Sequence, residues 1–103
     1  MTRFGLSEET LQKINGVFAK YPDIEQAILY GSRAKGTYKN GSDIDLTLKG
    51  ERLTAETLYR IFQELEDLFL PYKIDLSLFY DLEDPSFLDH IGRVGVVVYS
   101  VYL

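Results

Sequence analysis

Two spacings of hydrophobic residues recur along the chain, and each predicts one kind of element. Apolar residues three or four apart, the helical spacing, cover residues 6–20 and again residues 53–69. Apolar or alternating runs, the strand spacing, cover residues 25–30, 43–48, 73–80 and 94–101. Helices and strands are thus interleaved along the chain, which predicts an α/β fold.

The two long predicted helices carry start and stop signals. Ser7 and Thr54 are placed to cap the N-termini, and each lies between two leucines that can form a hydrophobic staple. Pro22 and Pro71 follow the helix ends. We assign the apolar stripes of both helices to the core and no chemistry to them.

A third, shorter helix is predicted near the C-terminus. Asp84 is placed as an N-cap with Pro85 at the first helical position, and Gly92 is a stop signal after Ile91. His90 lies in the last turn, where a surface histidine complements the helix dipole. Because no second His or Cys is nearby in the sequence, we reject a zinc or triad role for it.

Two of the predicted strands have nearly the same sequence. Residues 74–78, Ile-Asp-Leu-Ser-Leu, repeat residues 44–48, Ile-Asp-Leu-Thr-Leu. Period two places Asp43 and Asp45 on one strand face, opposite the core-directed residues, and places Asp75 on the matching face. Aspartate is poorly favoured in strands, so something should compensate for it, although an aspartate on the rim of a sheet is not rare. If the two strands are neighbours, three carboxylates converge at one point.

The predicted fold is α/β (α+β) with two layers, in one domain of residues 1–103. We expect a small mixed sheet of about four strands, with helices on one face and the acidic site on the other. The helix-length spacer between the two aspartate-bearing strands permits a parallel crossover. The short link across residues 31–42 favours an antiparallel or tightly turned pair.

Composition narrows the class of protein. With 46% apolar and 26% charged residues, the 103-residue chain reads as an ordinary globular protein, and its net charge of −5 argues against a general nucleic-acid binder. The absence of cysteine excludes disulfides and thiolate metal sites. No membrane-spanning run or signal-peptide pattern is present, so we expect a cytoplasmic protein. Eight tyrosines are many for this length, and an aromatic surface left over after the core would indicate a partner interface.

The candidate chemistry lies in residues 31–46. Gly31-Ser32 follows an apolar strand, where backbone N–H groups and a hydroxyl can meet phosphate oxygens, and three basic residues come before the Asp43–Asp45 pair. Paired carboxylates are hard oxygen ligands that suit magnesium. Taken alone, each piece is more simply a turn, a hairpin signal or a solvated strand face. An EF-hand is excluded because Gly41 precedes the acids instead of following them.

These residues resemble a known family. Gly31-Ser32, ten further residues, then Asp43-Ile44-Asp45 is similar to the signature of DNA polymerase beta-like nucleotidyltransferases. The nearest resemblance is to the minimal nucleotidyltransferase (MNT) antitoxins encoded beside HEPN toxins. The resemblance covers most of the chain. It implies the nucleotidyltransferase fold, and transfer of a nucleoside monophosphate from a nucleoside triphosphate.

The resemblance also implies roles for individual residues. ATP is the expected substrate, and Mg²⁺, in a two-metal site, is the expected cofactor. The expected catalytic and metal-binding residues are the three aspartates Asp43, Asp45 and Asp75. The expected nucleotide-binding residues are Gly31, Ser32, Arg33 and Lys35. Spacing leaves open which of Arg33, Lys35 and Lys39 contacts phosphate.

Three functions remain possible at this point. The first is transfer of AMP to a hydroxyl, most simply a tyrosine of a cognate HEPN-type toxin, with this chain as the antitoxin of the pair. The second is a non-catalytic module that neutralises a helical partner by covering it. The third is a small-molecule transferase of the aminoglycoside type, disfavoured because such enzymes carry a further acceptor domain. Because little chain remains to enclose a nucleotide, we expect a complex with a helical partner or a homodimer.

Overall fold

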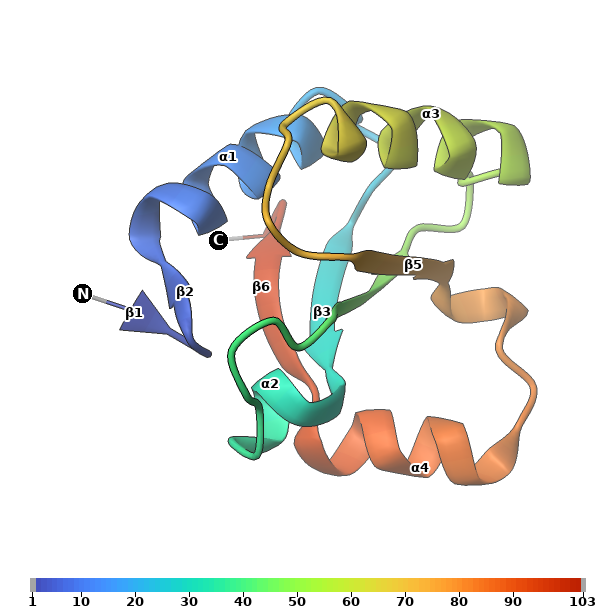
Figure 1. Cartoon of the computed structure of the whole chain (residues 1–103). Helices are drawn as coiled ribbons and strands as arrows, with labels where there is room; N and C mark the ends of the chain where they lie inside the picture. The colour runs from blue at the N-terminus through green and yellow to red at the C-terminus, as the bar shows by residue number, and fades with distance from the viewer. Residues whose placement is uncertain (1, 103) are drawn as a thin grey trace.

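The computed structural model describes residues 2–102 and is built on a four-stranded mixed sheet (Figure 1). In space the strand order is β5-β4-β3-β6. Strand β3 is antiparallel to both β4 and β6, whereas β4 is parallel to β5. The predicted mixed sheet, with one antiparallel link and one parallel crossover, is confirmed. The strands are β3 (Gln26–Tyr30), β4 (Ile44–Lys49), β5 (Ile74–Leu78) and β6 (Val96–Ser100).

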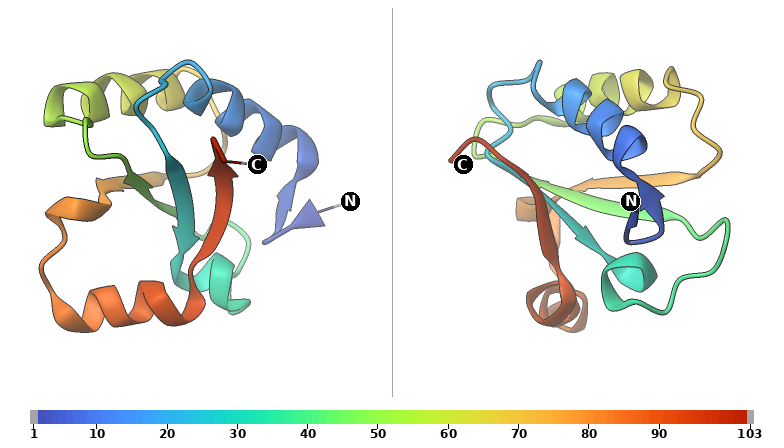
Figure 2. Two further views of the ribbon diagram at one scale, coloured as in Figure 1. Left: turned by 180° about the vertical axis from the view of Figure 1, so that it is seen from behind. Right: turned by 90° about the vertical axis from the view of Figure 1, so that its left-hand side faces the viewer.

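Two helices cover one face of this sheet. Helices α1 (Glu8–Phe18) and α3 (Ala55–Glu66) lie side by side on it (Figures 1 and 2). Their predicted caps are confirmed, since the side chains of Ser7 and Thr54 accept hydrogen bonds from backbone N–H groups three residues later. Within residues 2–102, no helix is long and apolar enough to cross a membrane.

The main core lies between these helices and the sheet. Alternate strand residues point into it, as the period-two pattern predicts. Burying such side chains contributes about 1.5–3 kcal/mol each, and this positions the opposite face of the sheet rigidly. Fully buried members from helices and strands include Ile14, Phe18, Leu29, Ile44, Leu46, Leu48, Ile61 and Leu65.

Helix α4 (Pro85–Val94) lies on the other side of the sheet, opposite α1 and α3 (Figure 2). Its Ile91 packs with Ile28 and Tyr30 in a second, smaller core. The predicted end at Gly92 is wrong, because the helix continues to Val94 and Gly95 N–H caps the Ile91 carbonyl. A glycine inside a helix costs only about 1 kcal/mol, which the packing of α4 on β3 offsets.

Three short elements differ from the sequence prediction. A hairpin of β1 (Thr2–Arg3) and β2 (Leu6–Ser7) precedes α1 and turns through two residues with positive φ. Gly31-Ser32, predicted as a turn, begins a one-turn helix, α2 (Gly31–Lys35). The strand predicted to reach Tyr80 ends at Leu78, where the 3₁₀ turn η1 (Phe79–Asp81) leads the chain towards α4.

Candidate active site

Asp45 and Asp75 are register partners on the parallel strands β4 and β5. Neighbouring strands lie about 4.8 Å apart, so two side chains at one register position lie next to each other on the same face. Asp43 stands two residues before Asp45, and its negative charge also acts on Asp45. The repeated Ile-Asp-Leu sequences therefore do form neighbouring strands, which was the condition for the carboxylates to converge. Each of the five residues of one repeat is paired with the corresponding residue of the other.

The surroundings of Asp45 disfavour its ionised carboxylate. Burial raises the pKa of its carboxyl, and the negative charges of Asp75 and Asp43 raise it further. His90 and Lys73 act in the opposite direction and lower it. Asp43 and Asp75 are exposed, whereas Asp45 is half-buried. A cation at this point would relieve the charge repulsion at Asp45.

Gly31 makes room for that carboxylate. Its φ is +74°, a conformation that side chains other than glycine rarely adopt. A Cβ atom at this position would overlap Oδ2 of Asp45 and lie 3.1 Å from its Cγ. Only glycine therefore allows both the turn from β3 into α2 and the approach of the Asp45 side chain.

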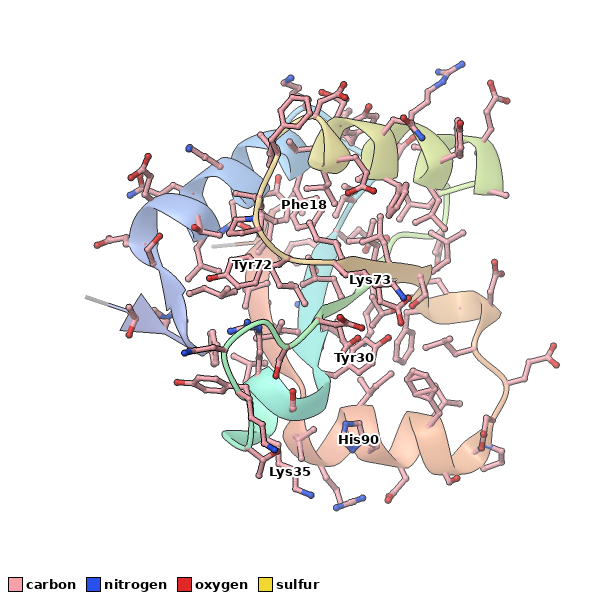
Figure 3. The ribbon with its side chains drawn as sticks, in the orientation of Figure 1. Phe18, Tyr30, Lys35, Tyr72, Lys73 and His90 are labelled. Atoms are coloured by element: carbon pink, nitrogen blue, oxygen red, sulfur yellow. The ribbon has the colours of Figure 1, made fainter. Side chains whose placement is uncertain are left out.

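His90 joins the site from α4, and the reading of it as a surface residue is wrong. The amide N–H of Gly31 donates a hydrogen bond to Nε2 of His90, with an N···N distance of 3.2 Å. The imidazole is half-buried and meets the ring of Tyr30 edge-on, with the ring centroids 6.4 Å apart (Figure 3). The sequence contains only one histidine and no local signal for this contact, because α4 reaches the site only through the fold.

Tyr30 forms the buried wall beside the aspartates. It is the register partner of Asp45 on β3. Burial, followed by the charges of Asp75 and Asp45, raises the pKa of Tyr30 to about 12, although the side chain of Ser77 acts in the other direction. The phenol therefore stays protonated at neutral pH. Ser77 also donates a 2.9 Å hydrogen bond to Thr47 Oγ1, which links β5 to β4 just beyond the aspartates.

The basic residues after Ser32 have different environments. Arg33 is only 2% exposed, and its guanidinium donates hydrogen bonds to the carbonyls of Phe4 and Ser42. It therefore ties α2 to the N-terminal hairpin and to the residue before Asp43. Lys35 is exposed and extends from the end of α2 into solvent (Figure 3). Lys35 is thus open to solvent, whereas the fold holds Arg33 in place.

The three aspartates have the donor chemistry of a magnesium site. Carboxylate oxygens suit this cation. Burial, followed by the negative charges of Asp75 and Asp43, raises the pKa of Asp45, so a cation here would favour its ionised form. Over residues 2–102, no three His, Cys, Asp or Glu side chains stand in a ready-made metal-binding cluster. Asp43 and Asp75 are exposed, so their side chains have room to change rotamer.

Solved structures share this fold. A complex described as a tri-AMPylated Shewanella oneidensis HEPN toxin with MNT antitoxin is similar over 92% of this chain and 73% of that chain, with a TM-score of 0.67 and 15% identity. A toxin–antitoxin complex with AMP-PNP is similar over 93% and 75%, with a TM-score of 0.68 and 20% identity. An MntA–HepT toxin–antitoxin complex is similar over 93% of this chain and 74% of that chain, with a TM-score of 0.67 and 15% identity. These structural matches are to MNT antitoxins.

A protein-family comparison agrees with the structural one, whereas no curated protein matches the chain. The family model described as "Polymerase beta, Nucleotidyltransferase" matches residues 12–101. This range runs from α1 to the end of β6 and includes the Gly31-Ser32 turn and all three aspartates. The chain therefore belongs to the polymerase beta nucleotidyltransferase family.

Proposed function

We propose that this protein transfers AMP from ATP to a hydroxyl of a protein partner, a tyrosine of a cognate HEPN-type toxin. The observation that carries this proposal is the in-register pair Asp45 and Asp75, with Asp43 two residues ahead and Gly31 against Asp45. Family membership supports the reaction class. The similarity to MNT antitoxins in toxin complexes supports the protein acceptor.

Magnesium would be held by Asp43, Asp45 and Asp75. When bound, it would neutralise charge on the triphosphate and on the departing pyrophosphate. The protein's part is to gather the carboxylates on neighbouring strands before substrate arrives. Burial is the main cause of the raised pKa of Asp45, and the charges of the neighbouring Asp75 and Asp43 raise it further.

Ser32 and Lys35 would hold the phosphates at the start and end of α2. The Ser32 hydroxyl can donate to a phosphate oxygen, and the Lys35 ammonium adds a positive charge from the exposed surface. The Gly31 N–H, expected to meet a phosphate, donates a hydrogen bond to His90 in this structure. The contribution of Gly31 is the turn from β3 into α2, which carries Ser32 and leaves room for the Asp45 carboxylate.

Asp75 would act on the acceptor. It is exposed, so an incoming hydroxyl can reach its carboxylate and give up a proton to it. The freed oxygen then forms a bond to the α-phosphorus, and the bond from that phosphorus to the pyrophosphate oxygen breaks. Tyr30 remains neutral beside these steps because its pKa is raised to about 12.

A partner surface is available on the sheet edge formed by β6. Val97 on this strand is 42% exposed, and Val101 and Tyr102, which follow it, are 47% and 69% exposed. Apolar and aromatic groups of this kind are enriched in protein interfaces. The surplus of tyrosines expected from the sequence is thus partly on the surface. We propose that a helical HEPN-type partner covers it.

Labelled ATP tests this proposal. With magnesium and the purified partner, label in the α-phosphate of ATP should pass to the partner protein, whereas label in the γ-phosphate should not. Asp43→Asn should abolish the transfer and leave the complex intact. A partner that binds but gains no label from wild type would instead favour the non-catalytic module. Transfer of the γ-label would mean phosphorylation and would refute the proposal.

A further inference from the structure

Arg33 carries a buried charge that no acid neutralises in the described part of the chain. Its guanidinium is 2% exposed, and the ion pairs found over residues 2–102 all involve other basic residues. The groups that accept its hydrogen bonds are two neutral carbonyls, of Phe4 and Ser42. A buried charge of this kind is costly without an opposite charge, so the surroundings of Arg33 favour an anion.

Two aromatic rings flank the same guanidinium. The Arg33 Cζ atom lies 5.4 Å from the ring centroid of Tyr38 and 4.8 Å from that of Tyr72. Three of the five N–H donors of an arginine are used in the hydrogen bonds to Phe4 and Ser42. The remaining two N–H groups could serve a ligand in the hollow that Arg33 lines.

These residues line a hollow of about 510 Å³. Lys39 and Asn40 from the loop after α2 also line it, and one side is formed by the β1–β2 hairpin. None of its lining residues is an aspartate or glutamate, although the whole chain has a net charge of −5. A small anionic group would meet Arg33, the Lys39 ammonium and the Asn40 amide there.

The hollow adjoins the acidic site through the backbone. Ser42, held by Arg33 at 2.9 and 3.1 Å, directly precedes Asp43. Tyr72 lies on the segment that leads into β5, three residues before Asp75 (Figure 3). The Ile44 N–H bonds the Lys73 carbonyl, so both segments enter the sheet together. A molecule anchored in the hollow can therefore extend towards the aspartates.

We propose that this hollow binds an anionic oxygen group, a phosphate monoester or a carboxylate, carried by the acceptor molecule. It has no carboxylate to hold a metal, so the anion binds directly to Arg33 and Lys39 without magnesium. The triphosphate of ATP, in contrast, requires the metal at the aspartates. Naming the acceptor as the carrier rests on the proposed function, whereas anion binding does not.

Nuclear magnetic resonance with EDTA present tests the binding. AMP, as a phosphate monoester, and N-acetylglutamate, as a carboxylate, are titrated separately, with adenosine as the uncharged comparison. The backbone amides of Lys39, Asn40 and Tyr72 should shift with at least one of the two anions and not with adenosine. The anion that binds more tightly identifies the source of the group. Shifts that appear only in a parallel titration with magnesium in place of EDTA, or equally with adenosine, would overturn the proposal.

Three variants that leave Arg33 unchanged test whether the anion binds in the hollow. Lys39→Gln removes an exposed charge from the hollow and should weaken the anion about tenfold. Asn40→Asp places a carboxylate there and should abolish binding. Lys13→Gln makes the same charge change on α1, outside the hollow, and should have no effect. Equal weakening by Lys39→Gln and Lys13→Gln would overturn the proposal, because only overall charge would then matter.

Transfer kinetics test separately whether the acceptor carries the anionic group. In the transfer reaction, Lys39→Gln should raise KM for the acceptor and leave KM for ATP unchanged. A rise in KM for ATP alone would overturn the assignment to the acceptor. Because the titration with EDTA needs no transfer, its result stands even if the proposed AMP transfer fails.

Discussion

The amide of Gly31, at the end of β3, donates a hydrogen bond to Nε2 of His90 on α4, 59 positions later in the sequence. This bond ties the turn that carries Ser32 to a helix on the same side of the sheet as the aspartates. In this bond the backbone N–H of Gly31 is the donor and Nε2 of His90 is the acceptor. His90 is thus a positioning residue for the site.

Replacing His90 tests this role. His90→Ala should slow AMP transfer about tenfold, in the range known for residues that orient catalytic groups, while the protein stays folded. His90→Gln should recover part of the rate because its amide oxygen can accept the Gly31 N–H. Arg93→Gln on the same helix is the control, since its exposed ion pair with Asp89 contributes little. Equal rates for His90→Ala and wild type would remove His90 from the site.

Gly31 and Gly36 form a matched pair for a second prediction. Both have positive φ, but a Cβ at Gly36 would meet nothing within 4 Å, whereas one at Gly31 would overlap Asp45. Gly36→Ala should therefore lower the free energy of unfolding by the strain alone, about 1–2 kcal/mol. Gly31→Ala should lower it further and reduce transfer. Urea unfolding of both variants measures the difference, and equal losses would show that Asp45 does not need this space.

The raised pKa of Asp45 predicts how stability depends on pH. Its folded pKa lies above the ordinary value of 3.8, so ionised Asp45 destabilises the fold at neutral pH, and this effect disappears as pH falls below 3.8. Asp45→Asn should consequently be as stable as wild type or more stable at pH 7 without metal, and the gain should vanish towards pH 3.8. Thermal melts across this range measure it.

A surface aspartate provides the comparison. Asp89→Asn on α4 removes an exposed, ion-paired carboxylate and should give no gain at pH 7. Magnesium with ATP should stabilise wild type and the Asp89 variant, but not Asp45→Asn. Clear destabilisation of Asp45→Asn without metal would mean that this carboxylate serves the fold, and its catalytic assignment would have to be withdrawn.

Arg33 and Lys35 differ in how much the stability of the fold depends on their side chains. Arg33→Met leaves the carbonyls of Phe4 and Ser42 without their donor, which should cost about 2–4 kcal/mol of unfolding free energy. Lys35→Met removes an exposed side chain and should leave stability within about 0.5 kcal/mol while raising KM for ATP. Denaturant unfolding and transfer kinetics measure the two effects, and the opposite pattern would reverse the assignments.

The elements that the sequence predicts well are those set by local chemistry. Ser7, Thr54 and Asp84 cap their helices because a short polar side chain reaches the backbone N–H groups of the next turn. The register of Asp45 against Asp75 follows from the repeated sequence, since a shift by one residue would turn each strand's core residues to the wrong face.

The features that the sequence does not reveal depend on long-range contacts. His90 reaches Gly31 only after η1 and α4 bring the chain back across the sheet. Arg33 looks like any basic residue until the hairpin at Phe4 buries it. Gly92 carries a stop signal, but the packing of Ile91 in the second core holds α4 together beyond it.

The most direct test of the central claim is the intact mass of the partner protein after incubation with this protein, ATP and magnesium. Wild type should add whole AMP units to the partner. Asp43→Asn, Asp45→Asn and Asp75→Asn should each add none while still binding the partner. If the partner gains AMP equally with wild type and with any of these three variants, the account of that aspartate as catalytic is contradicted. If wild type adds no AMP under conditions where the complex forms, the protein acts by binding alone.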